Sequence, residues 1–457
     1  MTIIATSLFT ALFVAAPVAP ASQLAIENCD VGEIYAFNHG ECEIVLSNTG
    51  DRSVRVFDVV TGIAGDHVEP TETTVPAHAK AYLKFTLNAA NDAGHVRHSV
   101  RFRTDEPGHE ERSASAVAFV MSVLDEPRPQ LDFAVVKALA EPMRRSVDLV
   151  SHDVSDFRIT KIIETPAWIN AAIGADGHTL EASVKPDAGW GLHVDFLKVA
   201  TNAPQQSQAW IEVKADVHGE VVPNLNPYDL GLMRIGSVHE FHIPLRSRSG
   251  REFQIGKIEL EGLHGTTQVD SCEKTGKSCQ MLILRVADQQ PGPIKGHVWI
   301  ELPEYQQRLN LAVWGLLVPA DLKVKTLDAD AIAQQAAAAA GQSQTSKDVD
   351  LQRAVREAVG NANQAPPSGE GPLLKWSVAN GLAIHGFQIF RASDEAGPFV
   401  LLNQKTIPSI AKTQDSVGYQ YRDNTAESGK TYWYYIGLVY NDGRKQQLTG
   451  PQKVVAK

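Results

Sequence analysis

Residues 94–107, GHVRHSVRFRTDEP, alternate polar with apolar side chains and end in a Pro-containing turn. Such alternation is typical of a strand with one buried face. Comparable stretches start at Gly191 and Gly296. Their closing prolines are separated by 97 and 99 residues: Pro107, Pro204 and Pro303. A fixed period with matching landmarks indicates three duplicated domains.

Each copy is too long for a solenoid repeat and should therefore enclose its own core. Short alternating stretches recur within the copies, for example RSVRVFDVV (52–60) and AWIEVKADV (209–217), separated by Gly, Pro, Asn and Asp. This spacing predicts an all-β fold of tandem antiparallel sandwiches. Five tryptophans should belong to the sandwich cores: Trp168, Trp190, Trp210, Trp299 and Trp314.

The copies resemble bacterial immunoglobulin-like domains of the DUF1573 and ASH type. The first copy carries the Asp30-Val31-Gly32 opening and the Asn48-Thr49-Gly50 turn, and the second carries the Thr-Asn-x-Pro hairpin at 201–204. The second copy departs from the pattern with Ala134 at its opening, and the third has Leu-Pro-Glu-Tyr in place of the hairpin. The resemblance implies immunoglobulin-like sandwiches and says little about a shared ligand.

The C-terminal stretch is similar to a fibronectin type III domain. The resemblance covers residues 372–454 and includes Trp376, the strand GFQIFRAS (386–393) and Tyr432. It implies that Tyr432 occupies the tyrosine corner, where the hydroxyl bonds back to the main chain.

Alternation along the last module separates a core face from an outer face. One set of residues should line the core: Phe387, Ile389, Tyr432, Tyr434, Ile436 and Leu438. Phe390, Trp433 and Tyr435 should point outward and could form an exposed aromatic patch that binds a sugar or a partner protein. The alternative is that the linker helix or a neighbouring domain covers these rings.

The expected organisation has six parts. They are a signal peptide (1–21), three sandwiches (22–125, 126–220 and 221–320), an Ala-rich, partly helical linker (321–371) and the fibronectin module (372–457). The first segment has no charged side chain and closes in Ala19-Pro20-Ala21, a small-x-small cleavage pattern. We therefore expect export to the periplasm or the cell surface. No later apolar run is long enough to cross a membrane.

Four cysteines form two near pairs, Cys29 with Cys42 and Cys272 with Cys279. Neither pair has zinc-knuckle spacing or a histidine at ligand distance along the chain, so disulfides are favoured over a metal site in an exported protein.

Composition and motifs favour binding over catalysis. A net charge of −11 argues against a nucleic-acid partner, because phosphate binding needs clustered Lys and Arg. The sequence contains no nucleophile elbow, phosphate loop or His-Glu-x-x-His motif. His239 and His242 should face opposite sides of one strand. We expect a non-enzymatic binding or scaffold protein of the bacterial envelope, without cofactor or metal. The alternatives are a glycan-binding accessory module, with polysaccharide as its partner, and a cryptic hydrolase.

Overall fold

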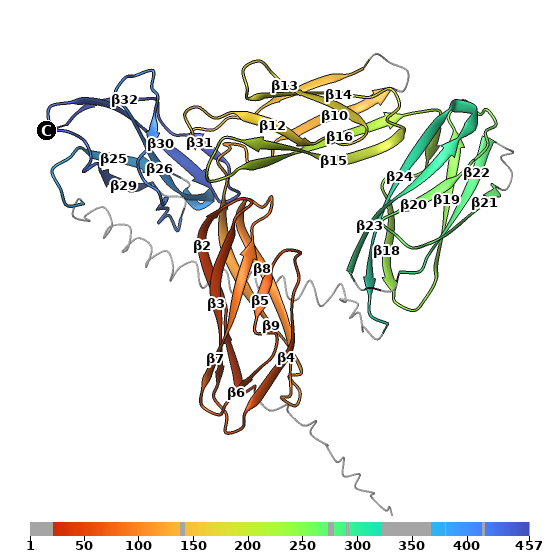
Figure 1. The fold of residues 1–457 in the computed structure, drawn as a ribbon, viewed down its shortest axis with the longest axis horizontal. Coiled ribbons are helices and arrows are strands. Elements are labelled where there is room, and N and C mark those ends of the chain that lie inside the picture. The colour runs from red at the N-terminus through yellow and green to blue at the C-terminus, as the bar shows by residue number, and fades with distance from the viewer. Residues whose placement is uncertain are drawn as a thin grey trace, which may run out of the picture. The chain divides into compact units, whose positions relative to one another are not determined.

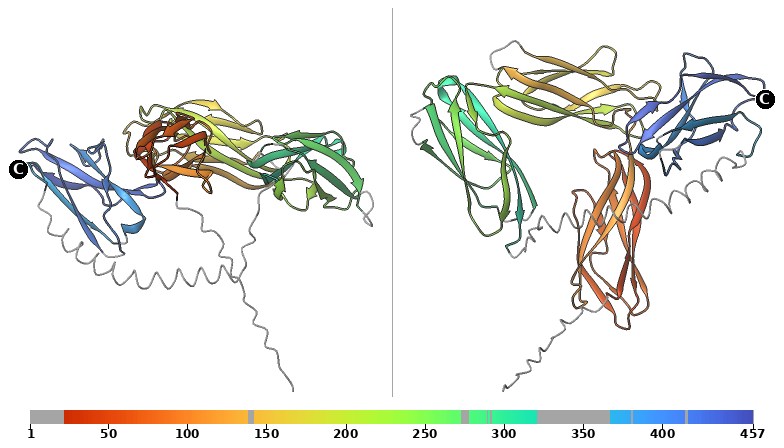
Figure 2. Two further views of the ribbon diagram at one scale, coloured as in Figure 1. Left: turned by 90° about the horizontal axis from the view of Figure 1, so that it is seen from below. Right: turned by 180° about the vertical axis from the view of Figure 1, so that it is seen from behind.

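The computed structural model describes residues 22–137, 142–272, 278–288, 290, 292–320, 367–379, 381–413 and 416–456. These residues form β-strands and two single-turn 3-10 helices, with no α-helix among them. The strands build several packed sheets, so the all-β sandwich fold is confirmed (Figures 1 and 2). The expected signal peptide and nearly all of the linker lie outside the described residues. Within the described part, no helix has the length and apolarity needed to cross a membrane.

Sandwich 1 consists of two facing sheets, ordered β1-β3-β7-β5 and β2-β9-β8-β4-β6. Its strands are β1 (Leu24–Glu27), β2 (Cys29–Tyr35), β3 (His39–Asn48), β4 (Val54–Thr61), β5 (His67–Glu69), β6 (Thr73–Val75), β7 (Lys80–Asn88), β8 (Gly94–Thr104) and β9 (Glu111–Met121). The stretch quoted above is β8, in which Val100 and Phe102 are buried while Arg101 and Arg103 are exposed. The expected alternation therefore holds.

Both predicted disulfides are present. Cys29–Cys42 joins β2 to β3 and thus connects the two sheets of sandwich 1. Cys272–Cys279 closes a short loop in sandwich 3.

Replacing both Cys29 and Cys42 with serine should lower the free energy of unfolding of sandwich 1 by about 3 kcal/mol, because the bridge restricts the unfolded chain. Urea unfolding monitored within sandwich 1, with and without a thiol reductant, measures this. A reductant that leaves the wild-type midpoint unchanged would contradict it.

Sandwiches 2 and 3 follow along the chain. Sandwich 2 contains β10 (Gln130–Lys137), β11 (Arg144–Asp148), β12 (Ile159–Glu164), β13 (Ile169–Ile173), β14 (Thr179–Val184), β15 (Trp190–Thr201) and β16 (Gln208–His218). Sandwich 3 contains β17 (Val221–Pro223), β18 (Tyr228–Arg234), β19 (His239–Ser247), β20 (Ile258–Glu261), β21 (Gly265–Ser271), β22 (Cys279–Val286), β23 (Gly292–Leu302), the 3-10 turn η2 (Pro303–Tyr305) and β24 (Gln307–Val318). Each has its own smaller sheet, β11-β14-β13 and β17-β19-β22-β21 respectively.

The larger sheets of sandwiches 2 and 3 are continuous. An eight-stranded sheet runs β10-β16-β15-β24-β23-β20, with β12 and β18 paired alongside. The join is a short parallel pairing of β15 with β24, in which Trp190 faces Leu309 and Gly191 faces Asn310. One apolar cluster extends from Val123 to Leu317 through both sandwiches. The expectation of a separate core in each copy is therefore wrong for this pair, because the sheets merge where their ends meet.

Asparagine side chains fix this join. The Asn310 side-chain amide donates to the Leu192 carbonyl oxygen at 2.8 Å. Asn226 donates to the Asn310 carbonyl oxygen at 2.9 Å and accepts from the Ala312 amide at 3.1 Å. Gly191 has φ +101°, and a Cβ there would lie 2.1 Å from the Asn310 carbonyl oxygen. Only glycine allows the two backbones to approach this closely.

The C-terminal module has a two-stranded sheet, β25-β29, and a larger sheet, β27-β26-β30-β31, to which β28 and β32 are also paired. Its strands are β25 (Leu373–Val378), β26 (Ile384–Ala392), β27 (Val400–Leu401), β28 (Ile407–Pro408), β29 (Val417–Arg422), β30 (Thr431–Tyr440), β31 (Lys445–Gln447) and β32 (Gln452–Val455); the 3-10 turn η3 (Gly381–Ala383) precedes β26. All six residues predicted to line the core do so. The Tyr432 hydroxyl accepts a hydrogen bond from the Glu427 amide at 3.3 Å, so the expected bond back to the main chain is present.

Candidate functional site

The predicted aromatic patch of Phe390, Trp433 and Tyr435 is largely covered. The three side chains lie on the outer face, as the alternation requires, but Phe390 is 1% exposed and Tyr435 is 4% exposed. Trp433 is half-buried, with the Lys453 ammonium 5.5 Å from its ring centre. Phe390 stacks on Tyr435 with ring centroids 4.6 Å apart. The expectation of an exposed patch is therefore wrong for Phe390 and Tyr435.

The covering groups come from a loop of the module and from sandwich 2. The Phe399 ring meets the Tyr435 ring edge-on, with centroids 4.9 Å apart. The His152 ring of sandwich 2 also meets it edge-on, with centroids 6.2 Å apart. Burial raises the pKa of the Tyr435 hydroxyl, and the carboxylates of Asp125 and Asp153 raise it further. This outcome matches the alternative in which a neighbouring domain covers the rings.

A buried ion pair accompanies this contact. Lys445 of β31 donates to Asp153, and each side chain is only 5% exposed. The Lys445 amide also donates to the Asp125 carbonyl oxygen at 2.8 Å. The Asp125 carboxylate in turn bonds to the His152 ring and so raises the pKa of that histidine. The outer face of the sheet β27-β26-β30-β31 thus contacts sandwich 2 at Tyr435 and Lys445, whereas Trp433 stays half-buried.

The cleft beside the join between sandwiches 2 and 3 is a better candidate. It has a volume of about 810 Å³, within the range typical of ligand sites. Strands β15, β20, β23 and β24, together with η2, supply most of its lining. We name it the junction cleft. Its larger apolar lining residues are Trp168, Trp299, Leu302 and Pro303. Its charged lining residues are Asp187, Asp195, Glu261, Glu301 and Arg308.

A row of aromatic rings lies behind the cleft. His193 is 2% exposed and sits between two tryptophans, 5.1 Å from Trp168 and 6.0 Å from Trp299. Burial lowers the pKa of His193 to about 4, and its Nε2 hydrogen-bonds to the Gly189 carbonyl oxygen at 3.2 Å. The ring is therefore neutral at pH 7 and adds no positive charge beneath the cleft.

Because His193 is buried, the free energy of unfolding should decrease in mild acid. Its folded pKa of about 4 is below the ordinary 6.5, so the unfolded chain binds the proton more readily and stability is lost as pH falls from 6.5 towards 4. The loss attributable to this ring should be about 3 kcal/mol over that interval. Urea unfolding at several pH values, compared with His193→Gln, measures it. Equal slopes for both proteins would refute the assignment.

Carboxylates dominate the charge of the junction cleft. Four line it, against the single guanidinium of Arg308. Arg308 lies 4.9 Å from the Trp299 ring centre and pairs at 2.6 Å with Glu259, a carboxylate outside the lining. Lys257 shares that carboxylate at 2.5 Å. The Trp299 indole donates to Glu261 at 2.7 Å, which orients both side chains. Asp187 and Asp195 are exposed.

Sequence reasoning missed this cleft because its residues come from two repeats. Trp168 and Trp190 are buried, as expected. Trp210 and Trp299 are half-buried. Trp314 is 51% exposed and so does not belong to a core, contrary to expectation. It lies on the outer face of β24 near two exposed leucines, Leu232 and Leu316. The available signal was the recurrence of Gly-His-Val at Gly94 and Gly296 and of Gly-Leu-His-Val at Gly191. The last two copies lie in β23 and β15, which both contribute to the cleft.

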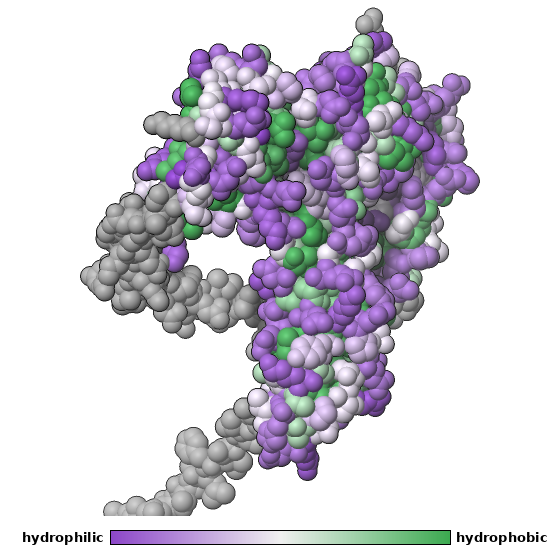
Figure 3. Space-filling view, turned by 60° about the vertical axis from the view of Figure 1, so that its left-hand side comes forward, coloured by the Kyte–Doolittle hydropathy of each residue, from purple (hydrophilic) through white to green (hydrophobic). Residues whose placement is uncertain are grey.

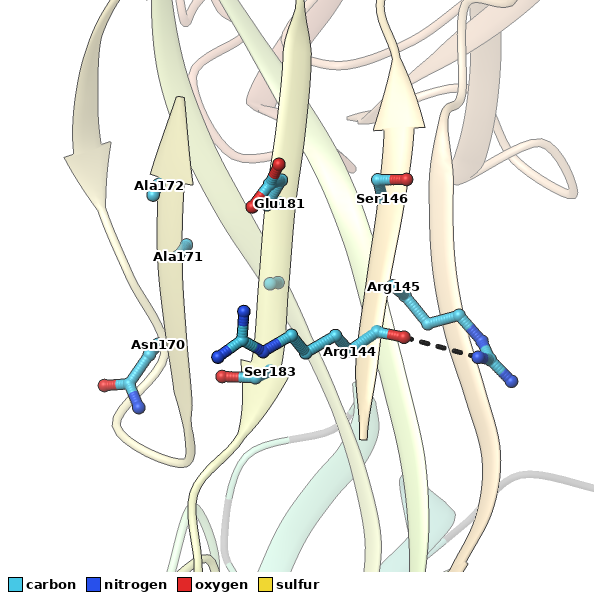
Figure 4. Close-up of a pocket in the computed structure, with 9 residues that line it drawn as sticks. Arg144, Arg145, Ser146, Asn170, Ala171, Ala172, Glu181 and Ser183 are labelled. Carbon is cyan, nitrogen blue, oxygen red and sulfur yellow. Dashed lines mark hydrogen bonds between the residues drawn. The ribbon is translucent and has the colours of Figure 1, made fainter. Parts of the chain in front are cut away.

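A second hollow of about 500 Å³ lies on the outer face of the sheet β11-β14-β13. Small side chains form its base, among them Ser146, Ala172 and Ser183. Figure 4 shows Arg144 extending over Ser183, its cross-strand neighbour, while Arg145 points away from the hollow. All of its lining residues come from this one small sheet, and we regard the hollow as a shallow polar surface. On the side of the molecule shown in Figure 3, small hydrophobic areas are likewise scattered among hydrophilic residues.

No group of three or more histidine, cysteine or acidic side chains that could hold a metal ion occurs in the described part of the chain. His239 Nε2 bonds to the Arg234 main chain, whereas His242 pairs with Glu240 at 2.9 Å. The two histidines thus have separate partners.

No protein-family model and no curated protein matches the chain. Among solved structures, it is similar to the ASH/PapD-like domain 7 of human CEP192, with 12% identity, 25% of this chain and 99% of that chain covered, and a TM-score of 0.19. It is also similar to the titin fragment I67–I69 (8% identity, 66% and 99% covered, TM-score 0.17). An endo-fucoidan hydrolase of glycoside hydrolase family 107 matches at 10% identity, with 65% and 45% covered and a TM-score of 0.18. Likenesses at this level bear on neither partner nor activity, so the fold rests on the sheets described above.

Proposed function

We propose that the protein is an exported, non-enzymatic binding or scaffold protein of the bacterial envelope, which acts through contacts between its sandwiches and a partner protein. The observation that carries the proposal is the continuous sheet across sandwiches 2 and 3, because it holds two sandwiches in one orientation and forms a cleft between them. Binding surfaces need such a rigid support. We further propose that the three sandwiches are of the DUF1573 and ASH type and that the last module is a fibronectin type III domain.

Unpaired strand edges add to this support. β21 ends one sheet of sandwich 3, and most of its residues are exposed. β11 and β13 are the two edges of the small sheet of sandwich 2. Such edges can accept a strand from another chain.

Glycan binding is the second candidate function, but the exposed aromatic patch on which it was based is largely covered. The rings proposed to stack on sugar include Phe390 and Tyr435, which are buried. Trp433 is the remaining half-buried ring of the three. Unchanged retention of the envelope polysaccharide by Trp433→Ala would reject a glycan site in the module.

In-cell crosslinking of the chain from residue 22 onward, followed by affinity capture and mass spectrometry, tests the proposal. We expect one envelope protein in stoichiometric amount. Recovery of the chain alone would argue against a protein-binding role. Hydrolytic activity of the purified protein, abolished by a single carboxylate or histidine substitution, would replace the proposal with an enzyme.

A further inference from the structure

We propose that the junction cleft binds an extended, lysine- or arginine-rich segment of the partner protein. The inference rests on the proposed function and names the surface and the chemistry of the partner. It combines three features of the cleft, namely its excess of carboxylates, its aromatic wall and its position beside a sheet edge.

Charge complementarity favours a basic occupant. Asp187 lies in the loop before β15, and Glu301 lies near the end of β23, so the carboxylates come from both sandwiches and face one space. Arg308 pairs with Glu259 at 2.6 Å, and Lys257 pairs with the same carboxylate at 2.5 Å. The four lining carboxylates together with Glu259 still outnumber these two cations. Close charge pairs across an interface can contribute clear net affinity and also raise the association rate. A basic segment would be attracted before it docks.

The aromatic wall suits the same occupant. Trp299 is half-buried, and its indole N–H is already bonded to Glu261 at 2.7 Å. The Arg308 guanidinium already lies 4.9 Å from the ring centre, and the rest of the exposed ring surface is apolar and π-rich, next to carboxylates. Lysine and arginine side chains bind such surfaces through their aliphatic stems and through cation–π attraction.

The neighbouring sheet edge favours an extended chain over a small cation. β20 is the last strand of the eight-stranded sheet, and its final residue, Glu261, lines the cleft. Gln306 and Gln307 line the cleft as well, and a glutamine side chain can both donate and accept hydrogen bonds. A peptide can use these groups with its own main chain while its basic side chains meet the carboxylates.

Fluorescence anisotropy of the full chain with a fluorescein-labelled peptide of alternating lysine and glycine tests the inference. The cleft variant is Asp187→Asn with Glu301→Gln. The matched control is Glu252→Gln with Glu395→Gln, which removes two exposed carboxylates elsewhere. We expect the cleft variant to raise Kd at least about tenfold and the control to match the wild type. Trp299→Ala should also weaken binding, and the glutamate–glycine counterpart should not bind.

Equal losses in the cleft and control variants would mean non-specific attraction and would overturn the inference. So would an unchanged Kd in the cleft variant. Binding of a glucosamine oligomer in place of the lysine peptide, sensitive to the same cleft variant, would assign the cleft to an amino sugar instead. If the peptide fails while crosslinking still recovers one stoichiometric envelope protein, the binding role stands and this site is wrong. If crosslinking fails, the binding role itself is at fault.

Discussion

Replacing Gly191 with alanine is expected to lower the free energy of unfolding of the joined sandwiches 2 and 3 by about 3 kcal/mol or more. The new Cβ would lie 2.1 Å from the Asn310 carbonyl oxygen and 3.0 Å from the Asn226 amide nitrogen, at φ +101°. The β15–β24 pairing must then separate. Urea unfolding should change from one shared transition for the two sandwiches to two.

Gly231→Ala is the matched control. Gly231 also has a positive φ, +65°, but a Cβ there would have no heavy atom within 4 Å. Only the backbone strain remains, which costs about 1 kcal/mol. Equal effects of the two substitutions, or a single unchanged transition in Gly191→Ala, would mean that the close approach at the join does not hold the sandwiches together.

Asp153→Ala is expected to release the C-terminal module from sandwich 2. The substitution leaves the Lys445 ammonium buried without a counter-charge, which typically costs about 3–5 kcal/mol. Undocking avoids that cost. The Lys445 amide, which donates to the Asp125 carbonyl oxygen at 2.8 Å, should then exchange its hydrogen at least a hundredfold faster. Exchange measured by mass spectrometry on the β31 peptide would report it.

The double variant Asp153→Leu with Lys445→Met tests whether docking needs the ion pair or only well-packed side chains at these two positions. Two apolar side chains of similar size can replace a buried ion pair at little cost. One Asp153 oxygen is buried without a hydrogen-bond partner in the described structure, so the native pair is not fully satisfied. The double variant should restore slow exchange. Continued fast exchange would show that the ion pair itself is required for docking.

The features that the sequence predicted correctly are those that depend on local alternation and spacing. The strand quoted first, the core set around Phe387 and Tyr432, and both disulfides follow from periodicity and spacing. The outward direction of Phe390 and Tyr435 was also predictable. These features depend on neighbours within one sheet, where a period of two residues decides which face each side chain occupies.

What depends on contacts between domains was not predictable. Nothing near Tyr435 in the sequence indicates that His152 approaches its ring. The joining of β15 to β24 likewise depends on how two copies meet. The junction cleft combines residues from 167 to 308, so no local motif marks it. A repeat reveals the fold of each copy but not the surface that two copies create together.

The most direct measurement is site-specific photo-crosslinking in cells, with the crosslinking residue placed at Asp187 in the junction cleft or at Glu252 on sandwich 3 outside it. The proposed role predicts one partner protein crosslinked from position 187, through a lysine- or arginine-rich segment, and little from position 252. Addition of Glu301→Gln should reduce that product. Equal crosslinking from both positions, or none from position 187 while the chain is correctly exported, would contradict partner binding at the joined sandwiches.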